Sequence, residues 1–117
     1  MNFRKYVILF LPLLLYSASC SKNEPVPVSD FVYSGNNNFK APCTVQFTNL
    51  STQAFSYGWW FGSDSSATTL DAPGSELTNP MHVYTKPGSF SVILRSYTES
   101  RKEWSSIIKT IIIKDSI

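Results

Sequence analysis

The sequence predicts an all-β domain, an antiparallel sandwich of about seven short strands. Apolar and polar residues alternate in several runs, as they do in strands that are buried on one face only. Glycine, proline, asparagine and serine separate these runs and mark turns. After an apolar N-terminal segment, no stretch shows the 3.6-residue period of an amphipathic helix.

Residues 1–19 have the pattern of a lipoprotein signal peptide. A basic start is followed by an apolar run from Tyr6 to Leu15, which is shorter than the ~20 residues of a membrane-spanning helix. Small residues then precede Cys20, the expected site of lipid attachment. Ser17 stands where a typical lipoprotein signal carries leucine, so an ordinary cleavage site beside a stray cysteine is the alternative. Acyl chains on Cys20 would hold the protein on a membrane, at about 0.8 kcal/mol per buried methylene.

Residues 20–27 are expected to form a tether, and residues 28–117 a single domain. Pro25 and Pro27 favour an extended spacer. Removal of the signal peptide takes away two of the ten basic residues and none of the eight acidic ones, so the mature net charge is near zero. A balanced charge gives no indication of a nucleic-acid-binding patch. The expected location is the cell envelope, with a lipid anchor in the outer membrane, at the cell surface or on the periplasmic face.

The strands are expected in a regular series along the domain. The second alternates apolar and polar residues over its whole length, and the last is rich in isoleucine, which favours β-structure. The fourth lies in a stretch rich in serine, threonine and proline and has the weakest pattern. In order, the expected strands are 29–33, 43–49, 55–61, 67–70, 81–84, 90–97 and 105–114.

The third of these strands carries aromatic rings at alternate positions. Tyr57, Trp59 and Phe61 share one face of an extended strand, and Trp60 points the opposite way. Burial of each ring is worth about 1.5–3 kcal/mol, so their shared face is expected to nucleate the core. Trp59 should lie between the sheets, surrounded by Val45, Phe47, Phe90, Val92, Leu94, Ile111 and Ile113.

Four short blocks of the sequence together resemble a PKD domain. They are Val45-x-Phe47-x-Asn49-x-Ser51, Tyr57-x-Trp59-x-Phe61-Gly62, Asn79-Pro80-x-His82-x-Tyr84 and Gly88-x-Phe90-x-Val92-x-Leu94. They stand in the family's order and at its spacing, across residues 28–114. The resemblance implies an immunoglobulin-like sandwich that serves surface proteins as a spacer or binding module without catalytic residues. The family usually continues Phe-Gly-Asp-Gly, and the departure at Ser63 predicts a turn of different shape.

The same resemblance implies structural roles for His82 and Tyr84. A neutral His82 ring would hydrogen-bond across strands, and the Tyr84 hydroxyl would bond a backbone group at the edge of the core. We expect neither an enzyme nor a cofactor, because His82 is the sole histidine and no phosphate loop, paired-cysteine motif or nucleophile elbow is present. Cys43 is expected to be a small buried thiol. The acidic residues Asp64, Asp71 and Glu76 are expected to be solvated rather than to bind calcium.

We hypothesise a contact surface on the outward face of the aromatic strand and its neighbours. Its expected residues are Trp60, Ile93, Arg95, Tyr97 and Ile112, with Ile108 as a further candidate. Exposed apolar patches usually mark contacts, and tryptophan, tyrosine and arginine are enriched in binding hot spots. Trp104 could extend this patch or cap the end of the sandwich, and capping is the favoured expectation. The partner would be a protein or, alternatively, a polysaccharide bound by an accessory lipoprotein of a polysaccharide-uptake system. Otherwise residues 63–80 or the tether would cover this face.

Overall fold

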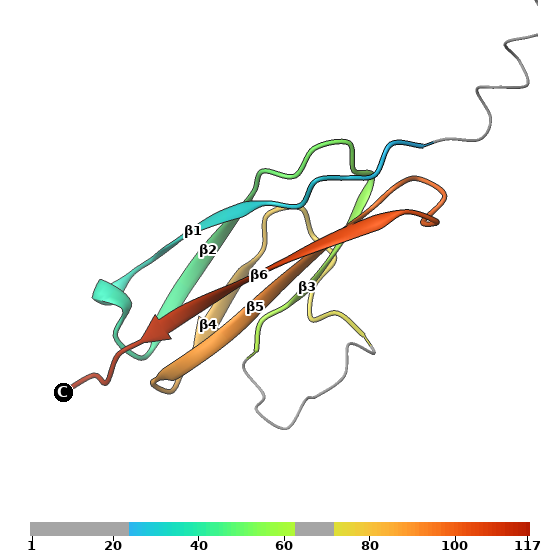
Figure 1. Ribbon diagram of the computed structural model, residues 1–117. Helices are drawn as coiled ribbons and strands as arrows, with labels where there is room; N and C mark the ends of the chain where they lie inside the picture. Colours follow the sequence, from blue (N-terminus) through green and yellow to red (C-terminus); the bar gives the residue numbers. More distant parts are fainter. Residues whose placement is uncertain (1–23, 63–71) are drawn as a thin grey trace, which may run out of the picture.

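The structure, a computed structural model, describes residues 24–62 and 72–117, which form two antiparallel sheets (Figure 1). One sheet has the order β1-β2-β4, with β1 at Phe31–Gly35, β2 at Cys43–Asn49 and β4 at Met81–Tyr84. The other has the order β3-β5-β6, with β3 at Ser56–Trp60, β5 at Gly88–Tyr97 and β6 at Trp104–Ile113. A short 3-10 helix, η1 (Asn37–Phe39), follows β1. The all-β sandwich predicted from the sequence is confirmed.

The described residues contain six strands, and the seventh expected strand, at 67–70, lies outside them. The sequence predicted a loop from Ser34, but β1 continues to Gly35, which pairs with Val45 of β2. The ring of Phe39 packs against this strand end, where an ideal Cβ on Gly35 would lie 2.5 Å from the nearest ring atom. The missing side chain therefore lets η1 fold back against β1.

The second sheet is built on a long hairpin. β5 and β6 pair over their full length, from Gly88 opposite Ile113 to Tyr97 opposite Trp104. On its other side β5 pairs with β3, which puts Trp59 opposite Leu94. β5 is therefore the central strand of this sheet, and β6 lies at its edge.

The core lies between the two sheets and is centred on Trp59. Its side chain is fully buried, and its ring centre lies 5.1 Å from that of Phe31 and 5.3 Å from that of Phe47. The indole N–H donates a hydrogen bond to the carbonyl oxygen of Leu77 over 2.9 Å. The expected neighbours Val45, Phe47, Val92, Leu94, Ile111 and Ile113 are buried, while Phe90 is half-buried. The predicted orientation of the aromatic strand is thus confirmed.

A glycine is required where the chain leaves β3. Gly62 has a φ of 69°, in the left-handed region that side chains disfavour. An ideal Cβ on Gly62 would lie 2.6 Å from the carbonyl oxygen of Ser91 in β5. Both the backbone angle and the close approach of β5 therefore exclude other residues.

The two ends of the described chain lie at opposite ends of the sandwich (Figure 1). Residues from Glu24 onward enter beside the β5–β6 turn, where Glu24 accepts hydrogen bonds from the backbone amide and hydroxyl of Ser100. The C-terminus leaves at the far end of β6, where Lys114 pairs with Lys40. Within 24–62 and 72–117, no helix has the length and apolar character needed to cross a membrane.

Candidate functional site

The outward face of the β3-β5-β6 sheet brings together the side chains that the sequence assigned to a contact surface. Cross-strand pairing places Trp60 beside Ile93, and Ile93 beside Ile108. Arg95 lies two pairs along on the same face, between Gly58 and Ser106, and Tyr97 lies opposite Trp104. We call the set Trp60, Ile93, Arg95, Tyr97, Trp104 and Ile108 the aromatic face.

Gly58 makes room for the Trp60 ring. An ideal Cβ on Gly58 would lie 3.0 Å from the Cη2 atom of Trp60 and 3.5 Å from the Cβ of Pro73. The indole therefore lies along the strand over Gly58, with Pro73 next to it. Pro73 belongs to the segment expected as an alternative cover and lies on the β3 side of the face. Residues 63–71 of that segment lie outside the described residues.

Arg95 is held by stacking on tryptophan rings. Its guanidinium carbon lies 4.1 Å from the ring centre of Trp104 and 5.7 Å from that of Trp60. A cation within about 6 Å of an aromatic ring centre is attracted by the ring's electron density. The Nε atom of Arg95 and the Nε1 atom of Trp60 are buried and have no hydrogen-bond partner within the described chain. Stacking rather than hydrogen bonding therefore orients these side chains.

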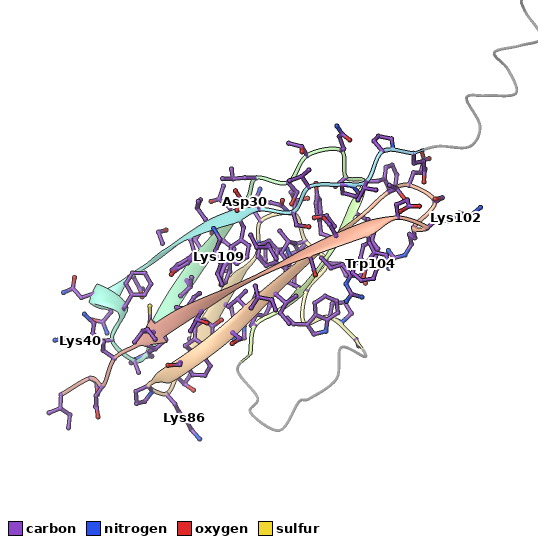
Figure 2. All side chains as sticks on the ribbon, in the orientation of Figure 1. Asp30, Lys40, Lys86, Lys102, Trp104 and Lys109 are labelled. Atoms are coloured by element: carbon purple, nitrogen blue, oxygen red, sulfur yellow. The ribbon has the colours of Figure 1, made fainter. Side chains whose placement is uncertain are left out.

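Trp104 extends the aromatic face, and the expectation that it caps the end of the sandwich is wrong. The β5–β6 hairpin stays paired as far as Trp104, which puts its ring on the same side as Tyr97. Its side chain is 48% exposed, and it lies toward the turn that carries Lys102 (Figure 2). At that turn the guanidinium carbon of Arg101 lies 4.0 Å from the ring centre of Tyr97. Toward the turn, arginine side chains and aromatic rings therefore alternate along the aromatic face.

The face is more open along β6 than along β3. Ile108 and Ile112 on β6 are 60% and 57% exposed, while Trp60 on β3 is half-buried. Ile112 points outward as expected, but it pairs with Ser89 and lies four positions beyond Ile108, away from the rings. The structure therefore joins four of the five predicted residues and leaves Ile112 apart from them.

His82 and Tyr84 have structural contacts at the other end of the sandwich. The His82 ring stacks on Phe61 at 4.4 Å between centres, and its Nε2 atom has no hydrogen-bond partner within the described residues. The expected cross-strand hydrogen bond is thus replaced by stacking. Burial lowers the pKa of His82, which keeps the ring neutral. The Tyr84 hydroxyl donates to the carbonyl oxygen of Phe61 over 2.9 Å, which confirms the expected backbone bond.

A cleft of about 670 Å³ beside these residues has little catalytic chemistry. Its lining includes His82, Tyr84, Lys86, Gly88 and Phe90. The Tyr84 hydroxyl is committed to a backbone carbonyl, and burial raises its pKa. Among the described residues no group of three or more histidine, cysteine, aspartate or glutamate side chains could hold a metal ion.

Lys109 is a structural residue that the sequence analysis missed. Strand alternation points it inward with Ile107 and Ile111, and its ammonium group donates to the carbonyl oxygen of Phe31. Its Nζ atom lies 3.3 Å from Asp30 Oδ1 and 5.1 Å from the ring centre of Phe31 (Figure 2). The alternation that placed the isoleucines was the available signal. Lys109 closes the side of the sandwich between the edges of the two sheets.

Of the remaining residues singled out in the sequence, the structure describes some and not others. Cys43 is a free, fully buried thiol as expected, and its Sγ atom lies 3.2 Å from the carbonyl oxygen of Asn36. Glu76 is exposed, as expected for a solvated acid. Cys20, Asp64 and Asp71 lie outside the described residues.

Comparison with known proteins identifies the fold independently. The model of the PKD domain family matches residues 30–103. The crystal structure of the PKD1 domain of Vibrio anguillarum Epp superposes with a TM-score of 0.60 and 20% identity, covering 80% of this chain and 99% of that one. The PKD1 domain of the Vibrio cholerae metalloprotease PrtV gives 0.58 and 24%, covering 77% and 99%. At these identities the likeness concerns the fold alone. No curated protein sequence matches the chain.

Proposed function

This chain belongs to the PKD domain family, and on that premise we propose that it is a non-catalytic interaction module of the cell envelope. PKD domains occur often in extracellular proteins, where they mediate interactions. In this proposal, lipid on Cys20 holds the protein to a membrane, residues 20–27 act as a tether, and the aromatic face docks a partner protein.

The observation that carries the proposal is the stack of Arg95 on Trp104 at the open side of the aromatic face. The guanidinium lies 4.1 Å from the ring centre, while the indole remains 48% exposed. Arginine and tryptophan held rigidly at a surface lose little side-chain entropy on binding, and both are enriched in hot spots. Ile108, 60% exposed on the same face, adds the aliphatic area that favours a protein partner.

A polysaccharide is the second candidate partner, and the exposed ring of Trp104 favours it. A flat aromatic ring can pack against the apolar face of a sugar. The protein would then be a glycan-binding accessory of a polysaccharide-uptake system. Binding of the full chain to a glycan array, lost in Trp104→Ser, would support this candidate over a protein partner.

The test of the protein partner uses a photo-crosslinking amino acid at Ile108 in intact cells. Thr48, exposed on β2 of the opposite sheet, is the matched control position. We expect one prominent adduct from position 108 and none from position 48. The adduct should weaken at least about tenfold when Trp60→Ser and Tyr97→Ser are combined, because Trp60 lies against Arg95 and Tyr97 lies opposite Trp104. Equal adducts from both positions, or adducts that survive the double change, would contradict the proposal.

The lipid anchor has its own test. Cells grown with an alkyne-bearing fatty acid should label the wild-type protein, and the membrane fraction should retain it. Cys20→Ser should abolish both the label and the retention, while Cys43→Ser should change neither, because Cys43 is buried in the domain. Label on the Cys20→Ser variant would overturn the anchor while leaving the aromatic face untouched.

A further inference from the structure

The outer edge of β6 has unpaired backbone groups. β6 is the last strand in the order β3-β5-β6, and within the described chain only Lys114, just beyond it, makes a backbone bridge on its outer side. The Lys114 amide donates to the carbonyl oxygen of Phe39, and its own carbonyl accepts from Ala41. Lys114 therefore directs its backbone groups away from β5.

Strand geometry extends this orientation to alternate residues of β6. Successive amides of a strand point to opposite sides, so those of Ser106, Ile108, Thr110 and Ile112 point the same way as those of Lys114. None of these four residues forms a backbone hydrogen bond on that side with another described residue. Their side chains are exposed. This stretch of edge is thus an open row of alternating donors and acceptors.

An open groove runs beside the distal half of this edge. Its volume is about 560 Å³, and its lining is Tyr33, Phe39, Thr110, Ile111, Ile112 and Lys114. Tyr33 and Phe39 are half-buried and belong to the opposite sheet and η1, and their ring centres lie 6.1 Å apart. A strand added to β6 would direct alternate side chains inward, into the space that these two rings border.

The groove ends beside two lysines that form no ion pair with the described residues. Lys40 and Lys114 are bridged through their backbones, and both side chains are exposed. The one salt bridge among the described residues joins Lys109 to Asp30, so neither Lys40 nor Lys114 has a carboxylate partner there. A ligand with a carboxylate at this end would meet complementary charge.

We propose that the β6 edge binds an extended segment of a partner polypeptide as an added antiparallel or parallel strand. The segment carries an apolar side chain facing Tyr33 and Phe39 and a carboxylate beside Lys114. Only a polypeptide strand supplies alternating backbone donors and acceptors at the spacing of the edge. A second copy of β6 fits less well, because it would bring another Lys109 into the inward row. This inference rests on the proposed role as an interaction module but uses a different surface.

The test attaches a probe strand in cis, so that weak affinity does not hide binding. The C-terminus leaves the domain beside Lys114, so the full chain is extended by a glycine-serine linker of about ten residues and a probe peptide. Two probes are used, with the sequences Glu-Thr-Val-Thr-Phe-Thr-Val and the reverse, because strand direction is open. A control probe replaces each threonine by proline, which removes alternate backbone donors.

Backbone amide exchange followed by NMR gives the readout. In the unextended chain, the backbone amides of Ile108, Thr110 and Ile112 should exchange quickly. The amides of Ile107 and Ile111 point toward β5 and should be protected. A probe should slow exchange at the first three by at least about tenfold, and the proline control should not. No added protection with either probe would overturn the proposal. Protection that appears without a probe as protein concentration rises would assign the edge to a second copy instead.

Thr110→Pro is the matched substitution. Proline is tolerated in an edge strand where the N–H faces solvent, so the β5–β6 ladder should persist while one edge donor is lost. Probe-induced protection of Ile108 and Ile112 should fall at least about tenfold in Thr110→Pro and stay unchanged in Thr110→Val. If Thr110→Pro does not fold, the proposal is tested by comparing amide exchange in the wild-type domain fused to a probe with exchange in the same domain fused to the proline control. Combined Trp60→Ser and Tyr97→Ser should not affect the probe, which separates this inference from the aromatic face.

Discussion

The hydroxyl of Tyr84 donates a hydrogen bond to the carbonyl oxygen of Phe61, 2.9 Å away, and joins the end of β4 to the residue just after β3. The two strands belong to different sheets, so this bond fastens the sheets together at one end of the sandwich. Tyr84 is almost fully buried, and its ring centre lies 4.6 Å from that of Phe90.

Tyr84→Phe should destabilise the domain although the ring is kept. A buried carbonyl left without its donor costs about 1–3 kcal/mol, and we expect a loss in this range in urea unfolding. The wild-type protein should also lose stability above about pH 10, because unfolded tyrosine ionises there while burial raises the pKa of Tyr84 in the fold. The variant should lack the part of this alkaline decline that Tyr84 causes. An identical decline in both proteins would contradict the assignment.

His82 should make stability depend on pH on the acid side of neutrality. Burial lowers its pKa below the ordinary value of 6.5, so the unfolded chain takes up a proton more readily than the fold does. The free energy of unfolding should therefore fall as pH drops below about 6.5. His82→Phe preserves a ring that can stack on Phe61 and removes the titration, so its stability should change less between pH 7 and pH 5. Equal slopes for both proteins would show that other groups cause the effect.

Trp59 and Trp60 should respond very differently to truncation. Trp59→Ala removes a fully buried indole at the centre of the core, and we expect a loss of about 3–5 kcal/mol, enough to unfold a marginal domain. Trp60→Ala removes a half-buried ring from the outward face and should cost about 1–2 kcal/mol. Thermal unfolding by circular dichroism compares the two. A larger loss for Trp60→Ala would reverse the orientation described for β3.

Lys109→Ile should promote aggregation more than it weakens the fold. An inward lysine on an edge strand discourages pairing with other chains, and its loss would leave a mostly isoleucine run from Ile107 to Ile113 without charge. Light scattering at a temperature where the fold is intact should rise faster for Lys109→Ile than for wild type. Lys109→Arg keeps the charge and should behave like wild type. Comparable scattering for all three proteins would remove the protective role of this lysine.

Local alternation explains what could be predicted from the sequence. The opposite orientations of Trp59 and Trp60 follow from the period of a strand, and so does the inward position of Leu94. The place of Trp104 depended on how far β6 stays paired beyond the turn, which no local pattern specifies. The role of Lys109 depended on Asp30 and Phe31, which reach it from the other sheet. Contacts between residues distant in sequence were therefore the part that could not be derived.

Because the chain enters beside the β5–β6 turn, the groove beside β6 lies far from the point of N-terminal attachment. Whatever precedes Glu24 is attached at that end of the domain, and the C-terminus lies at the opposite end (Figure 1). The groove lined by Tyr33, Phe39 and Lys114 lies toward the C-terminal end. The length of the sandwich therefore adds to the distance between any N-terminal attachment point and the groove. A partner strand bound there would be held away from the attachment point, with the C-terminus leaving beside it.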